Sequence, residues 1–349
     1  TENLIVREQV INQTLQKNFH SNETWNSCLS KFKNTNIFQC YEWGELKKSD
    51  GWEVLHITIT NNENLELTLA AQVLIKKFFG IKIAWCPGGP LVETQDLKNA
   101  QDALQKFKDI VIEENIFNLR CKPYIVANKY NESIFSNFIK PNTSLTSSKT
   151  NILKVVDEET FLSQVKKKHR YYIKQSQKQN ITWETFVGEQ ASVIFLKVYN
   201  EMKKHKNINL PIINIGKFSS LLGERKDGES RVFTYAGLEG ETPVSVCLIS
   251  IFQSRAFYHY AASTERGRSL SASYGMIFNL MRKLDNMQIS ELDFGGLSED
   301  GSSSGVDFFK KGFNGNNFQK LGEFDISKSK LHSYLFNKVL EFKNKIKRK

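Results

Sequence analysis

The alternation of strand-like and helix-like segments is the sequence feature that most restricts how this chain can fold. Many runs rich in Val, Ile, Thr and aromatic residues, bounded by polar or Gly/Pro turns, have the pattern of β-strands. They are Glu53–Thr60, Glu66–Lys76, Ile81–Trp85, Asn151–Val156, Ile181–Phe186, Arg231–Tyr235, Val244–Phe252, Ala256–Ala262 and Glu291–Phe294. Helical periodicity occupies Leu97–Glu114, Glu159–Gln179, Ser192–Lys204, Tyr274–Asn286 and Lys330–Lys345. Interleaved elements of these lengths predict a mixed α/β (α+β) fold.

The length and one polar stretch predict two domains. The chain has 349 residues, enough for two domains that each bury a core. Pro141–Thr150 is polar and unpatterned, and we interpret it as a linker, with a boundary between residues 148 and 149. Asp157 or Glu158 is expected to cap the helix that follows. Each half contains a helix, paired strands, a helix and a strand in similar order, which is consistent with a duplicated fold.

The apolar runs and the cysteines indicate a soluble protein of a reducing compartment. No apolar run approaches the roughly 20 residues that span a bilayer. Thr1–Asn12 lacks a basic start followed by an apolar stretch, so no secretory signal is visible and a cytoplasmic location is expected. The cysteines lie far apart without a C-x-x-C pair, so we expect neither a disulfide framework nor a metal site. Cys28, Cys40, Cys86, Cys121 and Cys247 are predicted to be buried small hydrophobes, the alternative being a reactive thiol.

The charge balance favours polyanionic partners. Lys and Arg number 48 against 37 acidic residues, a net charge of +11. RNA, a nucleotide-linked substrate or an anionic membrane surface would match this excess. Part of the charge is concentrated in Lys166–Arg170 and in a tail, Lys343–Lys349. Solvated helix faces are the alternative interpretation of both clusters.

The strand Ala256–Ala262 carries two tyrosines that can serve a site. Side chains alternate along a strand, so Tyr258 and Tyr260 are expected on one face and His259 on the other. Two phenols on one face can bind polar substrate atoms. Ordinary core tyrosines are the alternative.

The loop after this strand is a candidate anion site. Ser263–Ser273 contains Arg266 and Arg268 and leads into a helix, whose N-terminal N–H groups and dipole favour phosphate. It is not a Walker loop. A surface turn with a serine cap is the alternative. The loop is similar to the one with which GNAT acyltransferases hold acyl-coenzyme A, although Ser271 and Ser273 stand at its small-residue positions.

The segment from Asp293 to Phe313 is the strongest candidate for chemistry. A strand ends in Gly295-Gly296, where the backbone can approach a ligand closely. Lys310 then stands beside aromatic residues at a loop-to-helix junction, which suits holding a phosphate or a developing oxyanion. The alternative is a helix that ends at Gly312.

Together, these segments resemble the Fem family of aminoacyl-tRNA-dependent peptidyltransferases. The series Y-H-Y-A-A-S, L-D-F-G-G and F-F-K-K-G-F follows the family's order. The Gln39–Lys47 stretch resembles its Gln-x-x-x-Trp-x-x-x-Lys element. Trp85–Pro90 resembles its Pro-x-Gly-Pro turn, with Gly88 where Arg is common, and His169-Arg170 with Lys174 resembles its basic helix. The resemblance covers most of residues 36–325.

The resemblance implies a particular architecture. Fem-like proteins consist of two tandem GNAT-like domains, with the C-terminal segment returning to the first. Residues 1–148 would form the acceptor-side domain and residues 149–317 the donor and catalytic domain. Residues 318–349 would add a strand and a basic helix to the first domain. Residues 187–230 leave no room for a coiled-coil insertion, so the chain resembles the compact members.

The resemblance also implies an activity and its partners. Fem-like proteins transfer an amino acid from aminoacyl-tRNA to an amine of a cell-wall or cell-surface glycan precursor, which is nucleotide- or lipid-linked. No bound cofactor or metal is expected. A monomer is expected, in the cytoplasm or at the anionic inner face of the membrane.

The resemblance also implies roles for individual residues. Lys310, Asp293 and Tyr260 are the candidate catalytic residues: Lys310 would stabilise the oxyanion, and Asp293 or Asp307 would accept the proton of the amine. The remaining candidates would bind the substrates, and they are Lys47, Trp43, Tyr258, Phe309, Arg266, Arg268 and Arg170.

Two other functions compete with aminoacyl transfer. A GNAT-type N-acyltransferase would use acyl-coenzyme A on an amino sugar or amino acid, and would turn over without tRNA. A non-catalytic RNA- or membrane-surface-binding protein would bind in a salt-sensitive way and transfer nothing.

Overall fold

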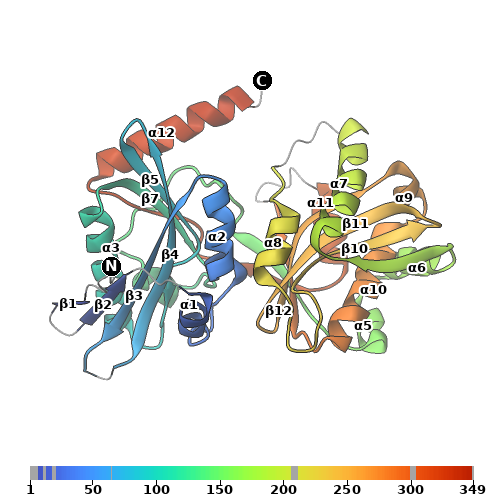
Figure 1. Cartoon of the computed structure of the whole chain (residues 1–349), viewed down its shortest axis with the longest axis horizontal. Coiled ribbons are helices and arrows are strands. Elements are labelled where there is room, and N and C mark those ends of the chain that lie inside the picture. Colours follow the sequence, from blue (N-terminus) through green and yellow to red (C-terminus); the bar gives the residue numbers. More distant parts are fainter. Residues whose placement is uncertain are drawn as a thin grey trace. The chain divides into compact units, whose positions relative to one another are not determined.

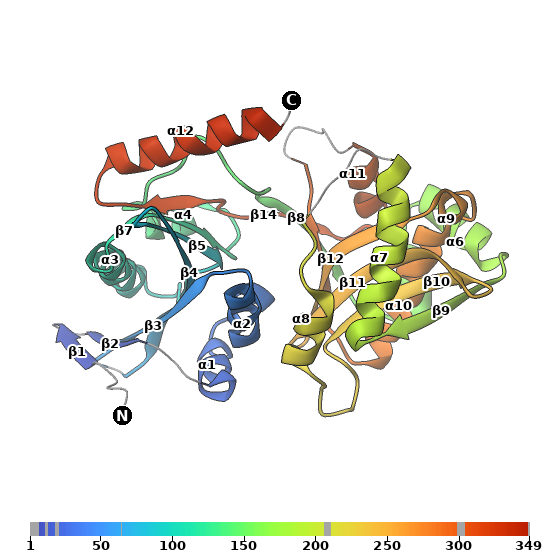
Figure 2. The ribbon, with the colours of Figure 1, turned by 45° about the horizontal axis from the view of Figure 1, so that its top comes forward.

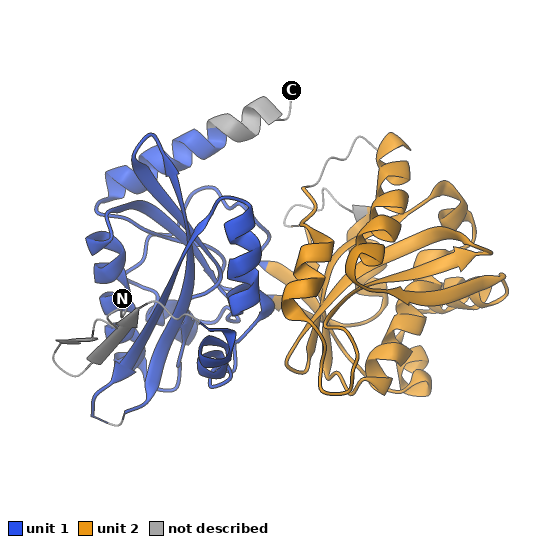
Figure 3. Ribbon diagram, viewed as in Figure 1, with its two compact units in different colours: residues 1–148, 319–349 blue, residues 149–318 orange. Residues whose placement is uncertain are grey.

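The computed structural model describes residues 7–10, 13–17, 21–63, 65–205, 211–298 and 304–347. The chain divides into two compact units (Figure 3). Unit 1 comprises Thr1–Ser148 and Gln319–Lys349, and unit 2 comprises Lys149–Phe318. Residues 299–303 lie outside the described residues. Of the expected basic tail Lys343–Lys349, only the backbone up to residue 347 is described, and none of the side chains.

Unit 1 is built on one mixed sheet (Figures 1 and 2). Its order is β1-β2-β3-β4-β5-β7-β15, with β6 also paired to β4. The strands are β1 Arg7–Val10, β2 Gln13–Lys17, β3 Glu53–Asn61, β4 Leu67–Phe78, β5 Ile81–Gly88, β6 Leu91–Val92, β7 Ile116–Pro123 and β15 Phe324–Ile326. Only β5 and β7 pair in parallel among these described strands, because α3 crosses between them.

Helices cover both faces of this sheet. They are α1 Asn22–Leu29, the 3₁₀ turn η1 Ile37–Gln39, α2 Tyr41–Ser49, α3 Leu97–Glu113, α4 Lys129–Ile134 and α12 Lys330–Lys347. Asp96 caps α3 by accepting from Asn99 N. The apolar stripe of α3, including Leu104 and Phe107, packs on alternate residues of β3 and β4. Helices α1 and α2 contact the same strands through the intervening residues.

The C-terminal segment completes unit 1 around a buried ion-pair network. Arg120 on β7 donates from Nε to Asp325 Oδ1 at 2.6 Å and from Nη1 to Glu323 Oε2 at 2.8 Å. Glu323 also accepts from the backbone N–H groups of Leu145 and Thr146. The polar stretch predicted to be a linker is therefore fixed to unit 1 by a buried carboxylate.

Unit 2 repeats the arrangement in its own sheet. The order is β14-β8-β13-β12-β11-β10-β9. The strands are β8 Lys149–Lys154, β9 Ile181–Phe186, β10 Val232–Glu239, β11 Thr242–Phe252, β12 Arg255–Ser263, β13 Glu291–Gly296 and β14 Asn316–Gln319. Here β12 and β13 form the parallel pair, and α10 crosses between them as α3 does in unit 1. The predicted mixed α/β fold is confirmed, with two units of similar topology.

The helices of unit 2 include one break that the periodicity did not predict. They are α5 Glu158–Gln164, α6 Lys167–Gln177, α7 Gly188–His205, α8 Ile215–Leu222, α9 Glu265–Ser269, α10 Ala272–Asn286 and α11 Ser304–Gly312. The single helix expected over Glu159–Gln179 is wrong. The backbone N–H of Lys166 bonds to Gly312 O at 3.0 Å, a tertiary contact that ends α5 and starts α6. Asp157 caps α5, as one of the two expected candidates.

The cysteines are free thiols. Cys40, Cys86, Cys121 and Cys247 are buried as predicted, and burial raises the pKa of each thiol. The expectation of full burial is wrong for Cys28, which is partly exposed at the end of α1.

Within the described residues, no helix is long and apolar enough to cross a membrane.

Candidate functional site

The candidate site lies where the parallel strands β12 and β13 separate. Their pairing runs from Arg255↔Glu291 to Phe257↔Asp293 and then stops. Beyond this point Gly295 has φ +78°, and a Cβ added to it would lie 3.5 Å from Tyr258 O and 3.8 Å from Lys310 Nζ. Glycine is suited to this position because the left-handed backbone disfavours a side chain, although the space would admit one. We call this place the strand divergence.

Lys310 reaches the strand divergence from α11. Its Nζ donates to Gly296 O at 2.8 Å. The side chain is half-buried, and burial lowers the pKa of the amine, while the nearby Asp293 and Asp307 carboxylates act in the opposite direction. A single cation held against a glycine turn can interact with an oxyanion that forms there.

Asp293 is buried and its carboxylate organises the turn. Its Oδ1 accepts from Thr150 Oγ1 at 2.8 Å and from Gly295 N at 2.9 Å. These bonds stabilise the charged carboxylate and fix the start of the Gly295-Gly296 turn. Asp307, the other carboxylate considered as a base, accepts from Ser298 N at 3.0 Å. Both carboxylates therefore have structural partners in addition to their proximity to Lys310.

A β-bulge places the two tyrosines differently from the prediction. In the pairing of β11 with β12, Leu248 lies opposite Tyr260 and the next residue, Ile249, lies opposite Tyr258. His259 is thus an extra residue on β12, and the simple alternation of faces is interrupted there. The expectation that Tyr258 and Tyr260 share one face is wrong.

The contacts of the rings agree with this register. Tyr258 packs on Phe294 with ring centroids 4.8 Å apart, in the core that α10 covers. Tyr260 lies 6.2 Å from the ring of Phe195 on α7, which covers the other face. Only Tyr258 contributes to the strand divergence through its backbone carbonyl, and burial raises the pKa of its phenol well above the usual range.

His259 is a half-buried neighbour with no role expected from the sequence. Its Nε2 lies 2.6 Å from Ser250 Oγ, and its ring contacts Phe218 on α8. Burial lowers the pKa of His259 to about 4, although the Asp293 carboxylate opposes this shift. The imidazole is therefore neutral at neutral pH. Its position depends on the bulge, which the sequence of a single strand does not reveal.

Phe309 belongs to an aromatic cluster around His169. His169 Nε2 donates to Phe309 O at 2.9 Å, and the Phe309 ring lies 5.1 Å from both Tyr274 and Phe313. Helix α11 does end at Gly312, and the packing against His169 is a second reason why a glycine stands at this position. A Cβ there would lie 1.9 Å from the His169 ring. The cluster thus fixes the end of α11 and, with it, the position of Lys310.

The arginines of the loop before α10 have protein partners. Arg266 forms an exposed ion pair with Glu239, and Arg268 donates to Ser263 O at 2.9 Å. The loop folds into the short helix α9, so the backbone N–H groups of Gly267, Arg268, Leu270 and Ser271 bond within the loop. These groups are not available to hold a pyrophosphate in this conformation.

Arg170 lies apart from the strand divergence, on α6. It donates from Nη1 to Leu162 O at 3.3 Å and is partly exposed. The structure therefore brings Lys310, Asp293, Phe309 and the Tyr258 backbone together, and leaves Arg170 elsewhere in unit 2.

The candidate residues of unit 1 form a separate group on α2. Lys47 Nζ lies 5.2 Å from the centroid of the Trp43 ring and 2.9 Å from Asp50 Oδ2. Trp43 is buried, and its ring meets Phe38 edge-on at 5.0 Å. Lys47 is thus held at the C-terminal end of α2 by one aromatic and one acidic neighbour.

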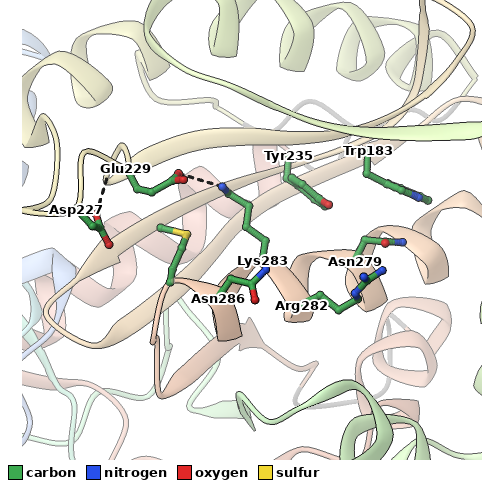
Figure 4. A pocket seen from close by; sticks show the side chains of 9 residues that line it. Trp183, Asp227, Glu229, Tyr235, Asn279, Arg282, Lys283 and Asn286 are labelled. Atoms are coloured by element: carbon green, nitrogen blue, oxygen red, sulfur yellow. Dashed lines mark hydrogen bonds and ion pairs between the residues drawn. The ribbon is translucent and has the colours of Figure 1, made fainter.

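A hollow of about 630 Å³ lies elsewhere in unit 2 (Figure 4). Trp183 and Tyr235 face Asn279 and Arg282 across it, and Lys283 pairs with Glu229 at 3.0 Å on its rim. None of the residues predicted for the site lines this hollow. We therefore place the chemistry at the strand divergence and not here.

Comparison with a family model identifies related sequences. The model of the FemAB family matches residues 21–153 and 224–341. This match confirms the family resemblance seen in the sequence. No curated protein matches the chain by sequence.

Solved structures share the fold. The crystal structure of FemX has a TM-score of 0.77 and 16% identity, covering 92% of this chain and 99% of that one. The C-terminal domain of a protein described as a lysylphosphatidylglycerol synthetase from Agrobacterium fabrum has a TM-score of 0.53 and 10% identity, covering 90% and 95%. A conserved protein of unknown function from Bacteroides thetaiotaomicron has a TM-score of 0.55 and 12% identity, covering 87% and 95%.

Proposed function

The chain belongs to the FemAB family, and from this premise we propose that it transfers an aminoacyl group from aminoacyl-tRNA to an amine of a cell-wall precursor. Membership supports the coarser statement directly: the chain is a Fem-type acyltransferase. The donor, the acceptor and the roles of individual residues are our proposal.

The observation that carries the proposal is Lys310 at the strand divergence of unit 2. Unit 1 has a matching parallel pair, β5 and β7, but its pairing continues from Lys82↔Ile116 to Gly88↔Pro123. In unit 2 the pairing stops at Phe257↔Asp293. Beyond this point β12 and β13 no longer pair with each other, and the Lys310 ammonium group lies beside the end of β13. This difference favours unit 2 as the place where the activated ester binds.

The chemistry needs no covalent enzyme intermediate. The acceptor amine attacks the carbonyl carbon of the ester that joins the amino acid to the terminal ribose of the tRNA. The carbonyl oxygen gains negative charge in the tetrahedral intermediate, the ester C–O bond then breaks, and an amide forms. The amine loses one proton and the ribose hydroxyl gains one, so the step is balanced. Positioning and charge stabilisation are the main contributions required of the protein.

Lys310 is proposed to stabilise the oxyanion. Its ammonium group is held at Gly296 O, and a ligand carbonyl that replaced or shared this bond would meet a partly desolvated cation. Asp293 keeps positive charge on Lys310 and orders the turn, which makes it a positioning residue in this proposal. We assign no general base, because Asp293 and Asp307 already accept hydrogen bonds from the protein.

The acceptor is proposed to bind at Lys47 and Trp43. Lys47 is largely buried along its stem and directs its ammonium group to the surface near Asp50. A phosphate of a nucleotide- or lipid-linked precursor would compete with Asp50 for this cation.

Acyl-coenzyme A is the alternative donor, and the conformation of the loop before α10 argues against it. A pyrophosphate site in this place would require free N–H groups, and four of them bond inside the loop. These four N–H groups are therefore not available to coenzyme A in this conformation.

Donor discrimination tests the proposal. The purified chain is incubated with charged tRNA or with acyl-coenzyme A, together with candidate amine acceptors, and the acceptor's gain in mass is measured. The proposal predicts mass gain with charged tRNA only, abolished by prior ribonuclease treatment of the tRNA. Mass gain with acyl-coenzyme A alone would replace the proposed donor, and salt-sensitive RNA binding without transfer to any amine would remove the enzymatic role.

A further inference from the structure

The β4–β5 hairpin of unit 1 ends in an exposed apolar tip. Phe78, Phe79 and Ile81 are 49%, 106% and 51% exposed. Phe79 has φ +47° and Gly80 has φ +81°, so a bulky aromatic residue occupies a backbone region that it rarely adopts. Neither the exposure nor the backbone angle of Phe79 stabilises unit 1 on its own. Such a tip is typical of a surface that meets another apolar phase.

Helix α12 of the same unit carries apolar residues on two sides. On the protein side, Ser333 Oγ and Asn337 Nδ2 donate to Asp325 Oδ2 at 2.8 and 2.9 Å, and the partly buried Phe336 ring lies 5.5 Å from the Arg120 guanidinium. A second apolar group faces away from unit 1. Its residues Leu331, Tyr334, Leu335 and Val339 are 62%, 53%, 47% and 65% exposed. An ordinary surface helix leaves mainly polar residues on this side.

The two apolar surfaces lie at the same end of unit 1. Lys82, at the base of the hairpin, pairs opposite Ile116 on β7. The adjacent Phe117 ring lies 4.7 Å from the ring of His332 on α12. We call the hairpin tip and the outward stripe of α12 together the apolar end of unit 1.

The charge around the apolar end selects one kind of partner. On the part of α12 whose side chains the structure describes, Lys330 and Lys338 are exposed, and Lys338 pairs with Glu341 at 3.0 Å. Lys76, Lys77 and Lys82 flank the hairpin tip, where Lys77 forms an exposed pair with Glu53. Apolar residues bordered by lysines match the acyl chains and anionic headgroups of a bilayer surface. Each lysine close to such a surface strengthens binding by about fivefold.

We propose that unit 1 docks on an anionic lipid bilayer through its apolar end. The hairpin tip inserts its aromatic residues below the headgroups, and α12 lies in the plane of the interface with Leu331, Leu335 and Val339 towards the lipid. The docking does not depend on the identity of the acyl donor, so its test is independent of the test of the proposed transfer activity.

The test is vesicle cosedimentation of the full chain. Wild-type protein is mixed with vesicles rich in phosphatidylglycerol and with vesicles of phosphatidylcholine alone. The double variants Phe78→Ser/Phe79→Ser and Leu335→Gln/Val339→Gln probe the two surfaces. Val193→Gln is the matched control, because Val193 is 56% exposed on α7 of unit 2. All these side chains are exposed, so the variants should fold.

The proposal expects binding to the phosphatidylglycerol vesicles only, weakened by salt. Each double variant should bind about tenfold more weakly, and the control should stay within about twofold of wild type. Absence of binding, equal binding to both lipids, or equal binding by the double variants would overturn it. Self-association that the double variants abolish, without vesicle binding, would overturn it in favour of a second copy of the chain.

A label at the hairpin gives an independent readout. Cys28 is replaced by Ser because it is partly exposed, and an environment-sensitive dye is attached to a Phe79→Cys variant. Insertion predicts a blue shift of the dye on adding phosphatidylglycerol vesicles, with quenching by lipids labelled in the acyl chain. Binding without any change in the dye would show that the hairpin tip does not insert.

Discussion

At the scale of single residues, Lys310 combines two opposing influences. Burial lowers the pKa of its amine, and the carboxylates of Asp293 and Asp307 keep it from falling further. Its hydrogen bond to Gly296 O at 2.8 Å fixes where the charge lies. An amine of this kind loses its charge at a lower pH than an exposed lysine.

This lowered pKa predicts an alkaline limit to transfer. Lys310 is charged below its pKa and neutral above it, so the rate should fall as pH rises through a value below the ordinary lysine pKa of about 10.4. The Lys310→Arg variant keeps its charge above about pH 12, so its fall should move to higher pH or vanish. Single-turnover rates from neutral to alkaline pH, corrected for hydrolysis of the donor alone, measure this. An unchanged fall in Lys310→Arg would assign the alkaline limit to another group.

The faces on which Tyr258 and Tyr260 lie could not be predicted from the sequence. Alternation along Ala256–Ala262 predicted a shared face for Tyr258 and Tyr260, and a bulge at His259 separated them. A bulge depends on the register with β11, which a single strand sequence does not contain. Lys310, in contrast, was proposed from its local context between aromatic residues and glycine, and the structure places its Nζ 2.8 Å from Gly296 O.

At the scale of elements, the Gln39 side chain bridges strands β4 and β5 of unit 1 beyond the point where their pairing ends. Its Nε2 donates to Pro87 O at 2.8 Å, and its Oε1 accepts from Gln72 N at 2.7 Å. The side-chain amide thereby satisfies one backbone group on each strand, as a neighbouring strand would do. The family-like Gln-x-x-x-Trp-x-x-x-Lys element thus begins with a structural residue and ends with Lys47, the proposed ligand for the acceptor.

Removing this amide should destabilise unit 1. Gln39→Ala leaves the buried Gln72 N–H and Pro87 carbonyl without their partner, so we expect a loss of about 2–4 kcal/mol in the free energy of unfolding. Gln95→Ala, an exposed glutamine of the same unit, should cost less than about 0.5 kcal/mol. Urea unfolding followed by tryptophan fluorescence measures both, since Trp25, Trp43, Trp52 and Trp85 all belong to unit 1. Equal costs would show that Gln39 does not bridge the strands.

The elements that the sequence predicted were those with strong local patterns. The helices α3, α7, α10 and α12 and most central strands lie within a few residues of their expected positions. Strand β7 was not predicted, although Asn118, Arg120 and Lys122 alternate with apolar residues as in a half-buried strand. Asn118 and Arg120 are buried only because Asp325, far along the sequence, supplies their partner. Such a partner cannot be found from local periodicity.

At the scale of the whole molecule, the chain returns to unit 1 to complete it. Strand β15 pairs with β7 from Phe324↔Cys121 to Ile326↔Leu119. Asp325, between them, binds Arg120, Ser333 and Asn337. One buried carboxylate thus joins the sheet, the returning strand and helix α12.

The loss of Asp325 should therefore affect all three. Asp325→Ala leaves the buried Arg120 with Glu323 as its remaining acidic partner, and we expect a cost of about 3–5 kcal/mol. Asp227→Ala, which removes a partly exposed partner of Arg225, should cost less than about 1 kcal/mol. Thermal and urea unfolding of the two variants decide this, and similar stabilities would contradict a structural role for the returning segment.

The two units share one topology but differ at the end of their parallel strands. In unit 1 the pair β5 and β7 remains joined up to Gly88↔Pro123, and in unit 2 the pair β12 and β13 separates after Asp293. The two sheets are otherwise similar, and only in unit 2 do the parallel strands part beside a cation, Lys310. We infer that transfer chemistry belongs to unit 2 for this reason.

The most direct measurement of that claim compares two neighbouring lysines on α11. Lys310 reaches the strand divergence, while Lys311 beside it is exposed and serves as a matched control of charge and helix position. Single-turnover transfer from charged tRNA to the acceptor amine is measured for wild type, Lys310→Ala and Lys311→Ala. We expect Lys310→Ala to be slower by about a hundredfold or more, and Lys311→Ala to remain within about threefold of wild type. Equal rates for wild type and Lys310→Ala would contradict the placement of the chemistry at the strand divergence.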